Sequence, residues 1–327
     1  MKNLLLLFGG GSTEHEISKV TCEFLEKKID SEKFTIFKVE IKKDGLWLYN
    51  DEKVFIDFDR NLKTSHGNIV KIDLCVPAIH GYPAETGDLQ SFLKMINIPF
   101  FGVESEPSSI CFNKVLTKLW LDAQGFPTTP FIFIKDTKSE SLKECKVFFK
   151  KYKKIFIKAS NQGSSIGCYP VSNEDEIENT LHEAFKFSDY VLVESFIDGR
   201  ELEVSVFEYD SKVMASSPGE INCPDTFYDY NQKYAKNSLT QIDIKAIDLS
   251  DAKAKEISDM AISVFNNLKL KDLSRIDFFL EGDKILINEI NTFPGMTPIS
   301  LFPQMLEATG IKFEDFINQR LVSLIRF

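Results

Sequence analysis

The chain has 327 residues, 43% of them hydrophobic, so it is long enough for two or three domains with cores of their own. Its 49 acidic and 39 basic residues give a formal net charge of −10, which argues against a nucleic-acid partner. The six cysteines form no CxxC pair, so we expect neither a zinc knuckle nor a disulfide framework, and a reducing cytoplasm fits.

The first predicted domain begins with a strand, a glycine turn and a helix. Residues 2–8 are a continuous apolar run, as in a buried parallel strand, and 16–27 carry apolar residues at helical spacing. The apolar opening is too short for a signal peptide, and we expect no membrane association. Further strands are predicted over 34–39, 72–79 and 98–103, with a helix over 88–96. The sequence therefore predicts an open parallel α/β domain over residues 1–110.

The remaining chain predicts two further domains, over residues 111–195 and 196–327. In the first, a helix over 111–124 precedes strands over 131–134, 155–158 and 191–194, and a second helix spans 174–187. In the second, a strand over 202–209 precedes a polar and aromatic stretch over 218–239, a helix over 251–268 and a hairpin over 275–291. A loop as long as 218–239 is typical of a functional lid or of disorder.

The glycine turn after the first strand contains Glu14, a carboxylate that suits a cationic ligand such as an ammonium group. The alternative is a first-turn helix acid stabilised by the helix dipole. A dinucleotide fingerprint fits less well, because Glu14 stands where the third glycine should be. His80 ends another apolar strand at the same sheet edge, and a single histidine there is more often an ordinary hydrogen-bonding residue than a catalyst.

A second glycine-rich loop, SNQGSSIG at 160–167, follows the strand that ends with Lys158. Its backbone N–H groups could face a phosphate, and the lysine precedes the glycines, unlike a Walker loop. We expect a mobile β-loop-β flap, with a plain glycine hairpin as the alternative. By itself, Lys114 at the start of a helix is more often solvated than functional. We expect the lysine cluster at 150–154 to be a solvated surface. The strand ending at Glu194 leads into a connector that could face an adenine and a ribose.

The hairpin over 275–291 predicts a metal site. Glu289 and Asn291 point to the same side of one strand, and a three-residue loop at 282–284 would place Asp277 opposite Glu289. Mg2+ takes one or two carboxylates and substrate phosphates, which such a set leaves room for. A solvated edge hairpin is the alternative.

Taken together, the segments resemble the D-alanine–D-alanine ligases of the ATP-grasp superfamily from Leu6 to Leu301. The matching motifs, in chain order, are GGGSTEHEIS (9–18), HGYPAETGDLQ (80–90), NKVLTK (113–118), KASNQGSSIG (158–167), VLVESFIDGRELEV (191–204), TFYDYNQKY (226–234), RID (275–277) and NEINTFPGMTPISL (288–301). The chain departs from the family pattern at Ala84 and Thr86 in the HGxxGEDG motif, and at Ala159, where a proline is usual.

The resemblance implies an α/β ATP-grasp fold of three domains and the ATP-dependent joining of two D-alanines through an acylphosphate, for peptidoglycan precursor synthesis. It also implies a cytoplasmic homodimer that uses ATP and two Mg2+ ions, with Mn2+ able to substitute. Its small-molecule partners would be D-alanine and ATP.

Carried over position by position, the resemblance gives each motif a role. Lys114 and Lys158 would hold the α- and β-phosphates. The other nucleotide-binding residues would be Ser165, Glu194, Ile197, Glu201 and Lys233, and the metal ligands would be Asp277, Glu289 and Asn291. Glu14, with His80 close by, would take the first D-alanine; Arg275 and Gly295 would form the oxyanion hole; Ser300 and Leu301 would bind the second D-alanine; Ser164 and Tyr234 would link the flap and the lid to Glu14.

Three rival functions remain at this point. A D-alanine–D-lactate ligase or another ATP-grasp carboxylate–amine ligase is the nearest, and the Lys233-Tyr234 pair favours the dipeptide product. A dinucleotide-dependent oxidoreductase could use the N-terminal unit, and a nicotinamide-binding test would detect it. A non-catalytic nucleotide-binding regulator is disfavoured, because the expected phosphate and metal residues are all present.

Overall fold

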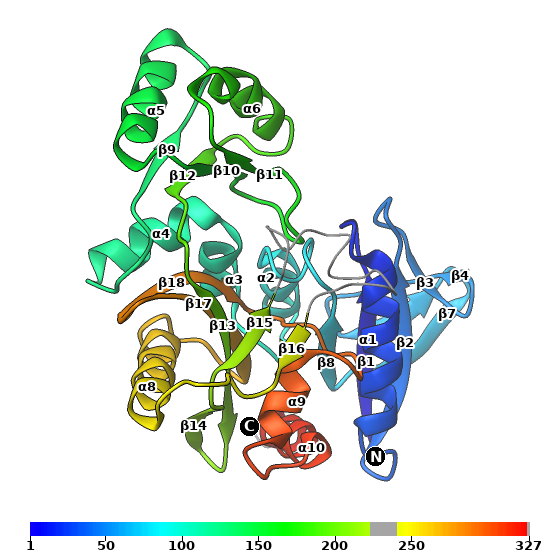
Figure 1. The fold of residues 1–327 in the computed structure, drawn as a ribbon. Coiled ribbons are helices and arrows are strands. Elements are labelled where there is room, and N and C mark those ends of the chain that lie inside the picture. The colour runs from blue at the N-terminus through cyan, green and yellow to red at the C-terminus, as the bar shows by residue number, and fades with distance from the viewer. Residues whose placement is uncertain (223–240, 326–327) are drawn as a thin grey trace.

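In the computed structural model, which describes residues 1–222 and 241–325, three main β-sheets follow one another along the chain (Figure 1). The strands are β1 (Lys2–Gly9), β2 (Phe34–Ile41), β3 (Trp47–Tyr49), β4 (Glu52–Lys53), β5 (Phe55–Ile56), β6 (Asn61–Thr64), β7 (Gly67–Lys71), β8 (Leu74–Ala78), β9 (Phe131–Ile134), β10 (Ile155–Ala159), β11 (Cys168–Val171), β12 (Val191–Ser195), β13 (Arg200–Tyr209), β14 (Lys212–Ala215), β15 (Gly219–Asn222), β16 (Gln241–Asp243), β17 (Leu273–Glu281) and β18 (Lys284–Asn291). The helices are α1 (His15–Lys28), α2 (Asp88–Met95), α3 (Ser105–Phe112), α4 (Lys114–Ala123), α5 (Ser139–Tyr152), η1 (Glu174–Glu176), α6 (Ile177–Ala184), α8 (Asp251–Asn267), α9 (Leu301–Glu307) and α10 (Phe313–Leu324).

The N-terminal sheet has the order β4-β3-β2-β1-β8, with β1 parallel to both β2 and β8. Leu4 and Leu6 of β1 are buried on one face, and Leu5 and Leu7 on the other. The open parallel core is therefore confirmed, although β3 and β4 add an antiparallel edge. The prediction of a strand over 98–103 is wrong, because this segment makes only one bridge, between Phe100 and Cys75. A small antiparallel sheet, β5-β6-β7, was not predicted.

The single helix predicted over 111–124 is two helices, α3 and α4, which meet at Asn113. The backbone of Asn113 is extended, and its side chain accepts a hydrogen bond of 3.1 Å from the Leu116 N–H, as an N-cap residue does. The break makes Lys114 the first residue of α4, where its backbone N–H is not needed within the helix. That N–H donates instead to the Ser160 carbonyl at 3.0 Å, and so connects α4 to the start of the glycine-rich loop.

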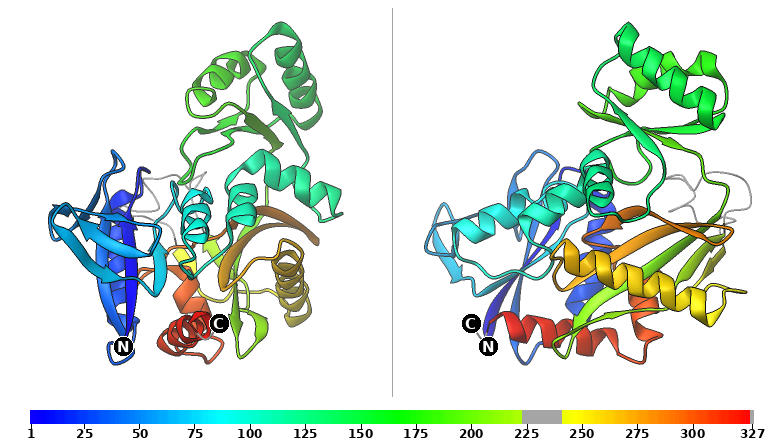
Figure 2. Two further views of the ribbon diagram at one scale, coloured as in Figure 1. Left: turned by 180° about the vertical axis from the view of Figure 1, so that it is seen from behind. Right: turned by 90° about the vertical axis from the view of Figure 1, so that its left-hand side faces the viewer.

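The central sheet has the antiparallel order β11-β10-β12-β9, and α5 and α6 cover one of its faces (Figures 1 and 2). Helix α5 was not predicted, because its polar residues and its lysines suggested a solvated surface. Cys145, Phe148 and Phe149 form its buried stripe. Lys150 and Lys151 lie in its last turn, where positive charge is favourable to the helix dipole. The helix predicted over 174–187 is shorter, with η1 followed by α6.

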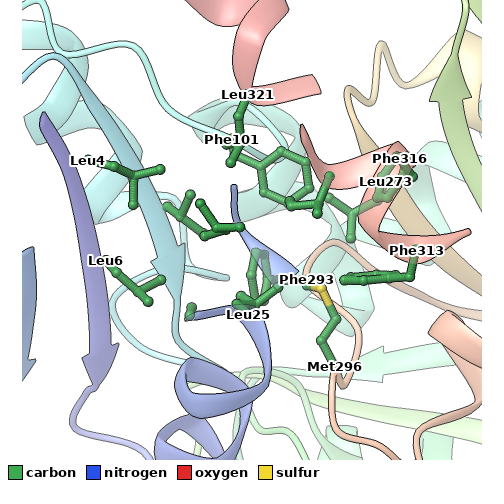
Figure 3. Close-up of a cluster of buried hydrophobic side chains, with 14 of the residues drawn as sticks. Leu4, Leu6, Leu25, Phe101, Leu273, Phe293, Met296, Phe313, Phe316 and Leu321 are labelled. Atoms are coloured by element: carbon green, nitrogen blue, oxygen red, sulfur yellow. The ribbon is translucent and has the colours of Figure 1, made fainter. Parts of the chain in front are cut away.

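The C-terminal sheet has the order β16-β15-β13-β17-β18, with β14 also paired to β13. Helix α8 packs on one face through Ile257, Ala261, Val264 and Phe265. Helices α9 and α10, which were not predicted, join a core that also contains Leu4 and Leu6 of the N-terminal sheet (Figure 3). The two ends of the chain therefore share one hydrophobic core.

In the β17–β18 hairpin, the predicted three-residue turn is wrong, but the predicted pairing of Asp277 with Glu289 is confirmed. The turn has two residues, Gly282 and Asp283, because Glu281 pairs with Lys284. Such a turn alone would place Asp277 opposite Asn288. A register shift between Asp277 and Phe278 adds one residue to β18, and Asp277 therefore faces Glu289 as predicted.

The three main sheets lie within the predicted ranges 1–110, 111–195 and 196–327, and these domain limits stay a prediction. Among the helices of the described residues, none has the length and apolar character needed to cross a membrane.

Candidate active site

A cavity of about 1500 Å³ lies where the three sheets meet, and it gathers residues that are far apart in the sequence. Lys233 and Tyr234 lie outside the described residues. The predicted site residues that line the cavity are Glu14, His80, Lys114, Lys158, Ser164, Ser165, Glu194, Ile197, Glu201, Arg275, Asp277, Glu289, Asn291, Gly295, Ser300 and Leu301. Every predicted site residue that the structure describes therefore borders one space, while the individual roles stay predictions.

The nucleotide half of the cavity is built around Glu194 of β12, a carboxylate whose residue is only 2% exposed. Its two oxygens face two lysines, Lys158 of β10 at 2.6 Å and Lys118 of α4 at 2.8 Å. Burial alone would raise the pKa of Glu194, but the charges of Lys118 and Lys158 outweigh it and lower that pKa. Burial would lower the pKa of Lys158, and Glu194 raises it instead. Lys158 therefore remains a cation at the wall of the cavity.

Lys118 is not among the predicted site residues, although it lines the same cavity. Its ammonium also contacts Thr128 at 2.6 Å, Thr129 at 3.0 Å and the Ile287 carbonyl at 3.0 Å. It thereby links α4, the central sheet and the C-terminal sheet. In the sequence, only its spacing of four residues from Lys114, one helical turn, connects Lys118 with the site. That spacing does not distinguish a buried lysine from a solvated one.

The aromatic residues beside Glu194 also escaped prediction. Phe156 and Phe196 are stacked with ring centroids 5.6 Å apart, and the Lys154 ammonium lies 3.4 Å from the Phe196 ring centroid. All three line the cavity. The prediction that the lysine cluster is only a solvated surface is therefore wrong for Lys154, which lies over an aromatic ring because a cation is attracted to its face.

The glycine-rich loop joins antiparallel β10 and β11, which confirms the β-loop-β arrangement. Ser164 and Ser165 both have positive φ, 51° and 59°. The Ser164 hydroxyl donates to Glu14 at 2.7 Å, and the Lys114 ammonium donates to the Gln162 carbonyl at 2.5 Å. The loop thus contacts both the N-terminal domain and α4, as a cover over the cavity would.

The predicted metal ligands lie together on the C-terminal sheet. Asp277 accepts two hydrogen bonds of 2.8 Å from Arg275 and one of 2.9 Å from the Asn291 amide. Glu203 lies 3.1 Å from the same guanidinium. Burial would lower the pKa of Arg275, but Asp277 and Glu203 raise it, so the guanidinium keeps its charge. Two carboxylates and an amide oxygen are a donor set suited to Mg2+.

The substrate half of the cavity is formed by loops from both ends of the chain. Glu85 accepts a 2.7 Å hydrogen bond from the Gly81 N–H. Burial and the nearby charge of Glu14 raise its pKa to about 7, against the opposing effect of the Gly81 and Phe293 N–H groups. Ser300 accepts from the Thr297 N–H at 3.0 Å, and its hydroxyl lies so close to Gly295 that a side chain there would contact it at 3.0 Å.

His80 is placed beside this half, but both of its ring nitrogens have protein partners. Nδ1 lies 3.2 Å from the Phe293 carbonyl and Nε2 lies 2.9 Å from the Thr21 hydroxyl. Burial lowers its pKa, with a smaller opposing effect of Glu14. The structure thus brings His80 to the cavity wall as a neutral, hydrogen-bonded ring.

Comparison with known proteins assigns the family. A family model described as D-ala D-ala ligase N-terminus matches residues 3–103, and one described as D-ala D-ala ligase C-terminus matches residues 120–323. The D-alanine–D-alanine ligase of Shewanella pealeana is 44% identical over 99% of this chain and 99% of its own length. That of Vibrio atlanticus is 44% identical over 97% of this chain and 96% of its own length.

Solved structures agree with the sequence comparison. D-alanyl-alanine synthetase A from Vibrio cholerae superposes with a TM-score of 0.93 at 42% identity, covering 99% of this chain and 98% of its own. The VanG D-Ala:D-Ser ligase from Enterococcus faecalis superposes with a TM-score of 0.88 at 26% identity, covering 99% of both chains. The predicted ATP-grasp fold is confirmed by these likenesses. The chain belongs to the D-alanine–D-alanine ligase family.

Proposed function

We propose that this protein joins two molecules of D-alanine into D-alanyl-D-alanine, with cleavage of ATP to ADP and phosphate, for peptidoglycan precursor synthesis. The observation that carries the proposal is the shared cavity. Its phosphate lysine, its oxygen ligands and the Gly295 turn face one space, and Glu289 is near enough to Lys158 to raise the pKa of that lysine. A carboxylate, a γ-phosphate and an amine could therefore meet there.

In the first step, a carboxylate oxygen of the first D-alanine attacks the γ-phosphorus of ATP, and the bond to the bridging oxygen of ADP breaks. Positioning and charge neutralisation supply most of the rate in such transfers. Lys158 and Lys114 would hold the phosphates, with Ser165 in the flap. Glu194, Ile197 and Glu201 would line the adenine and ribose site. Glu14, which lies at the N-terminus of α1 and contacts Ser164, would bind the first D-alanine through its ammonium.

In the second step, the amine of the second D-alanine attacks the acylphosphate carbonyl, and collapse of the tetrahedral intermediate releases phosphate. Arg275 and the Gly295 N–H would stabilise the oxyanion, since donors fixed in advance are most effective where charge develops. Ser300 and Leu301 would receive the carboxylate of the second substrate. Tyr234 with Ser164 is our candidate for holding the amine proton, and Lys233 would contact the nucleotide.

Mg2+ fits the donor set of Asp277, Glu289 and Asn291, and when bound it would neutralise charge on the phosphates. The finer points remain proposals: two ions, replacement of Mg2+ by Mn2+, a homodimer, and a cytoplasmic location.

The reaction can be tested by phosphate release from ATP with purified protein, Mg2+ and each standard D- and L-amino acid. We expect release with D-alanine. With equal D-alanine, D-serine and D-lactate we expect D-alanyl-D-alanine to predominate, with a yield that rises from about pH 6 to pH 9 as the bound ammonium loses its proton. The likeness to a D-Ala:D-Ser ligase makes D-alanyl-D-serine the second candidate product. Predominance of that product, or of the depsipeptide, would overturn the acceptor assignment alone.

Ser300→Ala is expected to raise the KM for the second D-alanine by about tenfold, the effect of losing a hydrogen bond to a charged group. The KM values for ATP and the first D-alanine should change little. Thr297→Val is the matched control, because it removes the hydroxyl that lies 2.7 Å from Ser300 and leaves the Ser300 hydroxyl in place. Steady-state kinetics would measure all three constants, and an equal rise in all of them would indicate a disturbed 294–301 turn instead.

A further inference from the structure

The backbone of Phe293 is held by the loop that follows β8. The His80 ring lies 3.2 Å from its carbonyl, and its N–H faces Glu85, whose pKa it lowers. The Phe293 side chain is 5% exposed and packs in the core that includes Met296 (Figure 3). Gly295 follows two residues later. The groups that hold the Phe293 backbone therefore act two residues before Gly295.

The partners of the His80 ring determine which nitrogen carries its proton. A carbonyl can only accept a hydrogen bond, so Nδ1 must carry the proton to bond Phe293. The bare Nε2 then accepts from the Thr21 hydroxyl at 2.9 Å. Thr21 is completely buried on α1, and the pairing spans 59 residues of sequence. With both nitrogens engaged, the ring has no hydrogen-bonding atom left for a substrate.

We propose that His80 is a positioning residue whose Nδ1–H holds the Phe293 carbonyl, that Thr21 fixes the ring in this tautomer, and that together they set the position of the Gly295 turn. This assignment replaces the expected role of His80 as a ligand of the first D-alanine. The expected effect on kcat rests on the proposed function. The tautomer of His80 does not, because it can be measured in the protein without substrate.

The tautomer can be measured first, without any assay of activity. The chain has four histidines, and the signals of His80 in nitrogen-15 NMR spectra are identified by their loss in His80→Asn. We expect the Nδ1–H form in the native protein and in Thr21→Ser, which keeps the hydroxyl. We expect the Nε2–H form to gain population in Thr21→Val, which has the same shape without the hydroxyl. An Nε2–H tautomer in the native protein would overturn the proposal.

Two substitutions of His80 then separate positioning from substrate binding. The amide nitrogen of Asn lies close to the place of Nδ1, and that of Gln close to the place of Nε2. We expect His80→Asn to keep more of kcat than His80→Gln, and Thr21→Val to lower kcat by about three- to tenfold, the loss of one hydrogen bond. The KM for the first D-alanine should change less than kcat. Better activity in His80→Gln, or an effect on that KM alone, would contradict the proposal. Should Thr21→Val fail to fold, the native tautomer and the His80 pair still decide it.

Discussion

Replacing Lys118 with methionine is expected to lower the free energy of unfolding by about 3 kcal/mol, which is the low end of the range for breaking a buried ion pair. The side chain of Lys118 is 2% exposed, and its removal leaves Glu194 with Lys158 as its remaining cation. Methionine has a similar volume, so the loss comes from the broken Lys118–Glu194 ion pair rather than from a cavity. Affinity for ATP should fall as well, because Lys158 would then be held more tightly by Glu194. Chemical denaturation and nucleotide titration would measure the two effects.

Lys114→Met is the matched control, since it is the same substitution one turn earlier on α4. Lys114 is only partly buried and bonds a loop carbonyl, so its loss should weaken ATP binding with little change in stability. The double variant Lys118→Met/Glu194→Gln should recover much of the lost stability. Removing both members of a buried ion pair costs less free energy of unfolding than removing only one of them. Strictly additive losses would show that the two charges do not depend on each other.

The second large effect is expected for Glu289→Gln, which removes one charge from the proposed metal ligands with almost no change of shape. Turnover should fall by on the order of a hundredfold or more, because a divalent ion contributes several kcal/mol to stabilisation of the transferring phosphate. The Mg2+ concentration for half-maximal activity should rise. Thermal stability should change little, because Ile285, Ile287 and Ile290 are the residues of this strand that pack in the core, and Glu289 lies on the opposite face. Activity measured against Mg2+ concentration and thermal unfolding would test both statements.

Glu281→Gln is the control for this substitution, because Glu281 is an exposed carboxylate at the far end of the same hairpin, opposite Lys284. It should leave both activity and the Mg2+ requirement unchanged. Equal effects of the two substitutions, or a loss of stability in Glu289→Gln that matches its loss of activity, would favour a solvated hairpin over a metal site.

Local patterns were sufficient for the elements whose apolar residues repeat clearly. Strand β1 and helix α8 follow from an apolar run and a helical period, and their bounds differ from the predicted ones by a residue or so. Helix α5 was missed because its buried stripe is short and is surrounded by lysines. The 98–103 segment was mistaken for a strand because it is apolar, yet it makes only one bridge. A short run of apolar residues indicates burial, but it does not distinguish a buried loop from a strand.

Site residues could be predicted where the type of residue and its spacing indicate its chemistry. They could not be predicted where the role of a residue depends on partners from distant segments of the chain. The carboxylates of the hairpin and the lysine before the glycine loop could be found from spacing and resemblance. The four contacts of Lys118 come from β12, β18 and the segment before β9, and no local pattern encodes them. Likewise, the register of Asp277 depends on a bulge that compensates for a shorter turn.

The core shared by the two ends of the chain constrains how the protein can fold while it is being synthesised. One face of β1, which carries Leu4 and Leu6, packs in the same cluster as Phe313 and Phe316 of α10. Leu25 of α1 and Ile29 just after it can cover part of this face soon after it is made, but the part that α10 covers stays exposed until the last helices have been synthesised. The other face, with Leu5 and Leu7, packs against segments that end near residue 98 and can close early. The core around β1 is therefore complete only after α9 and α10 have been synthesised and have packed against it.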